Sequence, residues 1–131
     1  MRATLTQLRS WGARRQTWLY LLGLAGVLAL LYWPAVTLQG VFFVGDIYSL
    51  GYPARQSYAL ALRQGKMPLR TPDAIGWYPV LEEGQTAAYF PLNLLLYRLL
   101  PLPAALNYSV LLGLWIAGAG VFAYARSVGL R

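Results

Sequence analysis

The sequence contains neither cysteine nor histidine. Without cysteine the chain forms no disulfide and offers no thiolate nucleophile, and without both residues the common zinc ligand sets and imidazole acid–base catalysis are excluded. Carboxylates are also scarce, since the only acidic residues are Asp46, Asp73, Glu82 and Glu83. Any chemistry must therefore come from these four acids, the hydroxyls, the amides and the basic side chains.

Charge is low over the whole chain. Charged residues make up 11% of the sequence and hydrophobic residues 58%, whereas a soluble domain carries about 25% charged residues. The net charge of +7 does not indicate nucleic-acid binding, because the basic residues flank apolar runs and form no basic stripe. The composition predicts an integral membrane protein with lipid as its solvent.

Residues 18–36 form the first apolar run, WLYLLGLAGVLALLYWPAV. A bilayer core of about 30 Å needs roughly 20 helical residues, which this run supplies. Aromatic residues stand near both of its ends, as in an aromatic belt. The alternative is a cleaved signal peptide, but the run is longer than a typical signal-peptide core and no small-x-small cleavage site follows.

Residues 105–125 form the second apolar run and contain several small residues that would let another helix approach closely. A lipid-exposed helix whose glycines have no such role explains them equally well. Its Asn107-Tyr108-Ser109 triplet matches a glycosylation acceptor pattern but lies too close to the bilayer to be used. Four arginines precede the first run, and Arg126 and Arg131 follow the second. Because basic residues favour the cytoplasmic side, both termini are expected to be cytoplasmic.

The expected fold is an all-α integral protein of the inner (plasma) membrane, with two transmembrane helices flanking a long extracytoplasmic loop. The expected segments are a cytoplasmic stretch 1–17, a transmembrane helix 18–36, a loop 37–104, a transmembrane helix 105–125 and a cytoplasmic tail 126–131. The partners that follow from this are the lipid bilayer and further transmembrane helices, and nucleic acid is not among them.

The loop is too long for a simple connection and is expected to contain two short interfacial helices. The first spans residues 53–64, because Pro53 suits the first turn of a helix and Gly65 suits the position just past its end. Tyr58, Ala61 and Leu62 fall on one side of it, so it could lie flat on the membrane surface. The second spans residues 91–100 and is too short to cross the membrane, so it is interfacial, re-entrant or buried against partner helices.

Asp46 is the first candidate for chemistry, because a carboxylate at a membrane surface costs energy unless it has a partner or a function. It could accept a proton from an acceptor hydroxyl or bind a divalent cation, and the sequence identifies no cofactor beyond this candidate. The alternative is an aspartate that caps a helix or stabilises a turn.

Glu82 and Glu83 form a second candidate, because adjacent carboxylates can share a metal ion or raise each other's pKa. The alternative for this pair is a solvated turn. The arginines of the loop, Arg55, Arg63 and Arg70, could bind a phosphate or pyrophosphate, since guanidinium groups match phosphate oxygens. Contact with lipid headgroups explains them equally well.

Several short pieces of the loop occur in a recognisable order. These pieces are Gly45-Asp46, Tyr52-Pro53-Ala54-Arg55, Arg63-Gln64-Gly65-Lys66-Met67-Pro68-Leu69, Leu81-Glu82-Glu83-Gly84-Gln85 and Tyr89-Phe90-Pro91-Leu92-Asn93. In this order the loop resembles the first outer loop of YfhO-type bacterial membrane proteins, which belong broadly with the GT-C class of glycosyltransferases. The resemblance covers about residues 18–131, although Arg70-Thr71 stands where that family usually has Trp-Asn.

The resemblance implies the N-terminal end of a GT-C fold, a polyprenyl-phosphate-linked sugar donor and Asp46 as the catalytic residue. The residues expected to bind the substrate are Arg55, Arg63, Glu82, Glu83 and Gln85. Such enzymes have many membrane helices, so this chain with two is expected to be the N-terminal portion of a longer protein and inactive alone. The alternative function is a small non-catalytic two-span membrane protein that acts as a subunit or assembly partner.

Overall fold

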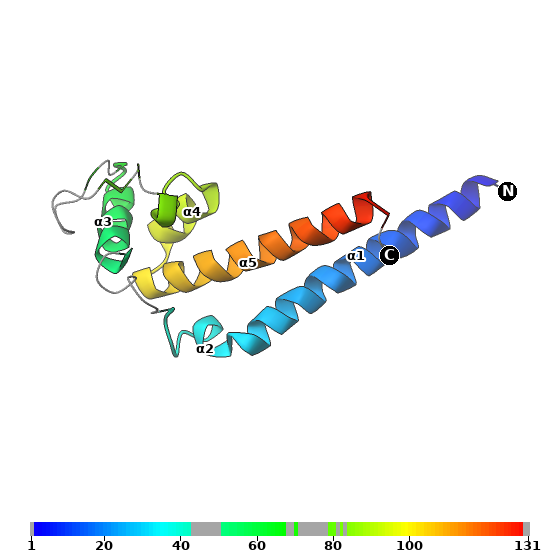
Figure 1. The fold of residues 1–131 in the computed structure, drawn as a ribbon, viewed down its shortest axis with the longest axis horizontal. Coiled ribbons are helices and arrows are strands. Elements are labelled where there is room, and N and C mark those ends of the chain that lie inside the picture. The colour runs from blue at the N-terminus through cyan, green and yellow to red at the C-terminus, as the bar shows by residue number, and fades with distance from the viewer. Residues whose placement is uncertain are drawn as a thin grey trace. The chain divides into compact units, whose positions relative to one another are not determined.

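The computed structural model describes residues 2–42, 51–67, 70, 79–80, 82 and 84–129, with the side chains of residues 2–14 and of Gln85 left out. Within these ranges the chain is helical and contains no strand (Figure 1). The expected all-α class is therefore confirmed for the described part. The chain divides into two units, one of residues 1–33 and 111–131 and the other of residues 34–110. We call them the helix-pair unit and the loop unit.

The helix-pair unit begins with α1, which runs from Arg2 to Leu31. The expected membrane segment 18–36 is not one helix, because α1 ends at Leu31 and a separate short helix, α2, covers Trp33–Val36. Pro34 explains the break: it has no N–H to donate to the carbonyl of residue 30, and its ring clashes with that carbonyl. α1 also continues toward the N-terminus through the expected cytoplasmic segment, so the change from polar to apolar residues does not mark its start.

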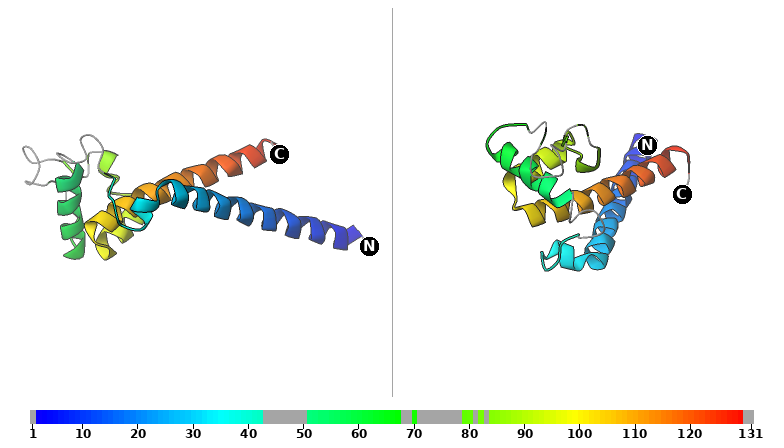
Figure 2. Two further views of the ribbon diagram at one scale, coloured as in Figure 1. Left: turned by 90° about the horizontal axis from the view of Figure 1, so that it is seen from below. Right: turned by 60° about the vertical axis from the view of Figure 1, so that its left-hand side comes forward.

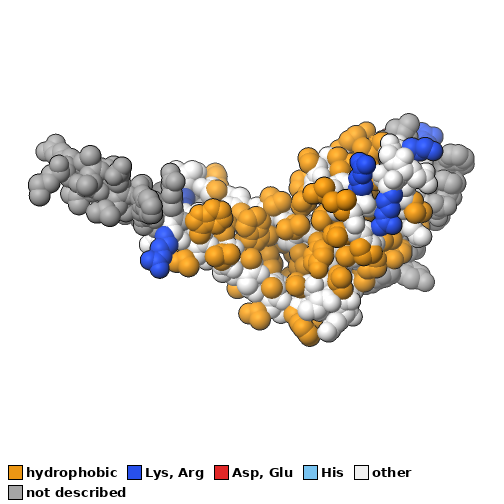
Figure 3. All heavy atoms as spheres, turned by 180° about the vertical axis from the view of Figure 1, so that it is seen from behind, with side chains coloured by type: hydrophobic (Ala, Val, Ile, Leu, Met, Phe, Trp, Pro, Cys, Tyr) orange, Lys and Arg blue, Asp and Glu red, His pale blue; other side chains and the backbone are white. Residues whose placement is uncertain are grey.

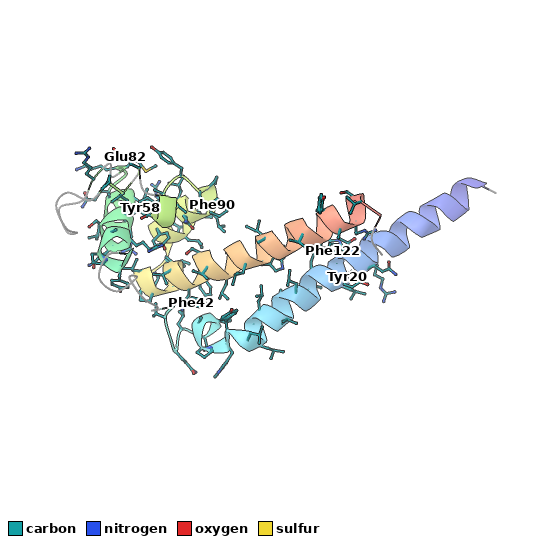
Figure 4. The ribbon with its side chains drawn as sticks, in the orientation of Figure 1. Tyr20, Phe42, Tyr58, Glu82, Phe90 and Phe122 are labelled. Carbon is teal, nitrogen blue, oxygen red and sulfur yellow. The ribbon has the colours of Figure 1, made fainter. Side chains whose placement is uncertain are left out.

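The second helix of this unit is the C-terminal part of α5, which spans Leu102–Ser127. It packs against α1 along its length. Gly118 lies against Leu24, and the ring centres of Tyr20 and Phe122 are 5.2 Å apart (Figure 4). Arg126 donates a hydrogen bond to the Thr17 hydroxyl, and the Trp115 indole N–H donates to the carbonyl of Leu21 at 3.1 Å. Residue numbers rise along α1 as they fall along α5, so the two helices are antiparallel.

Much of the helix pair presents apolar side chains to its surroundings (Figure 3). Leu22, Leu30 and Val121 are 65%, 81% and 69% exposed. Among the described helices, α5 is the one that is long and apolar enough to cross a membrane, and the apolar part of α1, Arg15–Leu31, is shorter. The expected second span, 105–125, lies wholly inside α5.

The loop unit contains α3 (Gly51–Arg63), the 3-10 helix η2 (Gly84–Thr86), α4 (Pro91–Leu99) and the start of α5. The two helices predicted in the loop are confirmed to within two residues at each end. Gly65 has a φ of +72°, and the amide of Lys66 donates to the carbonyl of Ala61 at 2.9 Å. This left-handed glycine ends α3 as the sequence predicts.

α3 and α4 lie side by side (Figure 2). Their buried core consists of Tyr58, Ala59, Leu62, Val80, Ala88, Tyr97 and Ala105. The apolar side of α3 predicted from Tyr58 and Leu62 is therefore covered by protein and is not free to lie on a membrane surface.

Candidate functional site

The structure describes some of the residues proposed as functional and omits others. Asp46 and Glu83 lie outside the described residues, and Gln85 is described only as part of the backbone of η2. Arg55, Arg63 and Glu82 are described with their side chains. The expected site can therefore be assessed from these three residues.

Arg55 and Arg63 both lie on α3, but each bonds a different backbone carbonyl. Arg55 donates from Nη1 to the carbonyl of Gly51 at 3.3 Å, within the first turn of the helix. Arg63 donates from Nη2 to the carbonyl of Leu100 at 2.7 Å, just past the end of α4. Eight residues of helix separate the two arginines by about 12 Å along the axis, so the structure does not bring them to one phosphate.

Glu82 forms an ion pair with Arg70, with 3.8 Å between Oε1 and Nη2. The two side chains are 70% and 59% exposed, so the pair contributes little to stability. Across the described residues there is no cluster of three or more acidic, histidine or cysteine side chains that could hold a metal ion. Because both side chains are mostly exposed, Glu82 and Arg70 are accessible to water or to a ligand.

Sequence reasoning missed a polar contact that forms around Asn107 and is the most extensive one among the described residues of the loop unit. This side chain is fully buried, and its Nδ2 donates to the carbonyls of Ala35 at 3.0 Å and Gly40 at 2.7 Å. Its Oδ1 accepts the amide N–H of Phe42 at 3.1 Å. The neighbouring Tyr108 donates from its hydroxyl to the carbonyl of Val36 at 3.1 Å.

We call this set of four hydrogen bonds the Asn107 clamp. It fixes residues 35–42 against the start of α5, although more than sixty residues of sequence separate the two segments. Leu38 in this segment has a φ of +60°, a strained conformation for a branched residue. The clamp ends at Phe42, four residues before Asp46 in the sequence. The only sequence signal was an asparagine inside an apolar run, which is costly unless its amide is hydrogen-bonded.

A second polar feature lies in the core between α3 and α4. The Tyr58 hydroxyl donates to the carbonyl of Ala88 at 2.6 Å, and the Tyr58 and Tyr97 rings meet edge to face at 5.5 Å. Burial, with a smaller contribution from Tyr97, raises the pKa of Tyr58 to about 12. The Tyr97 hydroxyl is also buried but has no hydrogen-bond partner among the described residues. Tyr58 therefore joins α3 to the residues that precede α4 by a hydrogen bond, whereas Tyr97 contacts the described residues through packing.

Comparison with protein-family models, with curated proteins and with solved structures found no match.

Proposed function

We propose that this chain is the N-terminal portion of a multi-pass membrane protein of the GT-C glycosyltransferase type, which takes its sugar from a polyprenyl-phosphate donor. In this proposal α1 and α5 form a membrane hairpin with both termini in the cytoplasm. The loop unit then lies on the outer surface and carries the substrate-facing residues.

The proposal of a membrane hairpin rests on one observation: two antiparallel helices present an apolar surface, and the central parts of both helices contain no charged residue. Neither residues 16–45 nor residues 99–125 contain a charged side chain. Large apolar side chains such as Leu30 point away from the protein, with 81% of that residue exposed. Exposure of such an apolar surface to water is unfavourable, whereas lipid tails or further apolar helices would remove it from water.

The helix lengths support the same proposal. The 26 residues of α5 extend about 39 Å at 1.5 Å per residue, which exceeds the bilayer core of about 30 Å. The apolar part of α1, Arg15–Leu31, extends about 26 Å and sits at the short end of what can span. The arginines before α1 and at the end of α5 would both lie inside, in agreement with the positive-inside rule.

The catalytic part of the proposal rests on the loop's resemblance to YfhO-type proteins and on the chemistry of its carboxylates. A base at the membrane surface is needed to activate an acceptor hydroxyl for attack on a lipid-linked sugar. Asp46 suits this role by its place in the sequence. The Asn107 clamp supports the assignment, because it fixes the segment that leads to Asp46 against the start of α5.

The test is Asp46→Asn in the full-length protein, assayed in membranes by transfer of labelled sugar from a polyprenyl-phosphate donor. Asparagine keeps the shape and removes the charge. Loss of a general base lowers turnover by about 10²- to 10⁴-fold, and we expect a loss of that size with normal membrane insertion. If Asp46 only caps a helix, asparagine would serve nearly as well. Near-normal turnover would therefore contradict the catalytic role.

We also expect the isolated 131-residue chain to be inactive, because two helices cannot enclose a lipid-linked donor. Sugar transfer by the purified chain alone would contradict this. The alternative is a non-catalytic subunit, and both functions fit the open glycines on the two helices: a Cβ added at Gly23, Gly26, Gly113 or Gly120 would meet no atom within 4 Å. Such surfaces admit neighbouring helices. Reading the gene downstream of the codon for Arg131 separates the two functions, because only the glycosyltransferase requires further spans in the same chain.

A further inference from the structure

One end of the helix pair holds an arginine in a defined position. Arg126 donates from Nη1 to Thr17 Oγ1 at 2.8 Å, and its Cζ lies 5.7 Å from the centre of the Phe122 ring. Phe122 in turn packs against Tyr20 of α1. Residues of both helices therefore position this guanidinium, which is exposed and has four further N–H donors.

The helix-pair unit has no acidic residue to balance this charge. It contains six arginines and no aspartate or glutamate: Arg2, Arg9, Arg14, Arg15, Arg126 and Arg131. The C-terminus of α5 carries only about half a negative charge from the helix dipole. The counter-ions of this unit must come from outside it.

The same end of the pair is rich in exposed aromatic side chains. Trp18, Tyr20 and Tyr124 are 64%, 61% and 68% exposed. Tryptophan and tyrosine concentrate at the level of lipid headgroups, because their rings suit the boundary between apolar and polar surroundings. An anion that meets Arg126 beside these rings would be part of a lipid and not a soluble ion.

We propose that the Thr17–Arg126 end of the helix pair binds the phosphate of an anionic phospholipid headgroup, and we call it the headgroup site. The inference rests on the proposed membrane insertion. Thr17 uses one N–H of the guanidinium and fixes its plane, and the remaining N–H groups present a fork to the phosphate oxygens. The neighbouring Arg15, also exposed, adds positive charge on α1.

The test compares lipid binding by the full chain in an uncharged detergent, with phosphatidylglycerol and phosphatidylcholine supplied in equal amounts and bound lipid measured by native mass spectrometry. One surface arginine contributes about 1 kcal/mol to anionic lipid binding, which corresponds to about fivefold in affinity. Arg126→Gln is therefore expected to weaken phosphatidylglycerol binding about fivefold and to leave phosphatidylcholine binding unchanged.

Two further variants separate a built site from simple charge. Thr17→Val keeps every charge but releases the guanidinium, so it is expected to weaken phosphatidylglycerol binding by less than Arg126→Gln. The matched control is Arg98→Gln, which removes the same charge from an exposed position on α4 and is expected to have no effect. Equal losses in Arg126→Gln and Arg98→Gln, or full binding in Thr17→Val, would overturn the headgroup site.

Two more measurements distinguish a lipid ligand from a soluble anion and test whether the chain enters a bilayer. Inorganic phosphate should not displace bound phosphatidylglycerol, and displacement at millimolar concentrations would show a site for soluble anions and overturn the lipid assignment. Flotation of the chain with vesicles of pure phosphatidylcholine tests insertion itself. Failure to float would contradict both the proposed function and this site. If the chain floats but native mass spectrometry shows no preference for phosphatidylglycerol, the site alone is overturned.

Discussion

Two buried tyrosines in the loop unit differ in the hydrogen bonding of their hydroxyls, and this difference predicts opposite effects on stability when each is replaced by phenylalanine. The Tyr58 hydroxyl donates to the carbonyl of Ala88 at 2.6 Å, and the Tyr97 hydroxyl has no partner among the described residues. Tyr58→Phe removes the donor and leaves a buried carbonyl unpaired, which costs about 1–3 kcal/mol. Tyr97→Phe removes a buried hydroxyl that makes no hydrogen bond to the described residues, so it should be neutral or stabilising.

Amide hydrogen exchange of the full chain in detergent measures this difference, because exchange in α3 reports the free energy of opening the loop unit. A cost of about 1–3 kcal/mol corresponds to exchange about 5- to 150-fold faster. We expect this acceleration across α3 in Tyr58→Phe and unchanged or slower exchange in Tyr97→Phe. Equal acceleration in the two variants, or none in Tyr58→Phe, would refute the assigned hydrogen bond.

The raised pKa of Tyr58 adds a pH dependence with a definite sign. The pKa is about 12 in the folded chain and 10.0 as the reference value. Below pH 10 the hydroxyl is protonated in both states, and between pH 10 and 12 the unfolded state loses its proton first. The folded state is therefore destabilised as pH rises through this window. The thermal midpoint of unfolding should fall between pH 10 and 12, and it should fall less in Tyr58→Phe.

The remaining predictions concern the Asn107 clamp and the helix pair. Asn107→Leu keeps the size of the side chain but removes its three hydrogen bonds to the backbone, at about 1–3 kcal/mol each. Amides within residues 35–42 should therefore exchange at least tenfold faster, and unchanged exchange would contradict the clamp. A Cβ added at Gly118 would lie 2.7 Å from Leu24, whereas one at Gly120 would meet nothing within 4 Å. Gly118→Leu should therefore reduce disulfide cross-linking between cysteines introduced on the two helices, and the matched Gly120→Leu should not; equal reduction would contradict the packing.

Local signals in the sequence predicted much of the fold. The apolar runs located α4 and the membrane-length helices, and Pro53 and Gly65 located the ends of α3, because proline and glycine act on the backbone within one turn. The extent of α1 was not predictable in this way. The change from arginine-rich to apolar sequence near residue 18 indicates where lipid could begin, but arginine is itself a good helix former and the helix continues through it.

The candidate site was less predictable, because its contacts join distant parts of the chain. The bond from Arg63 to the carbonyl of Leu100 and the bonds of Asn107 to residues 35–42 depend on how the helices pack. Composition and spacing hold no information about which backbone group a side chain will meet. Sequence reasoning therefore favoured charged residues as ligands and passed over the buried asparagine.

The central claim is a membrane hairpin with both termini inside and the loop unit outside, and the absence of native cysteine makes it directly testable. Single cysteines would be placed before Met1, at Leu60 on α3 and at Val128 after α5; the last two residues are 49% and 54% exposed. In intact spheroplasts a membrane-impermeant maleimide should label Leu60→Cys at once. It should label the two terminal cysteines only after the membrane is permeabilised. Labelling of either terminal cysteine in intact spheroplasts, or protection of Leu60→Cys, would contradict the account.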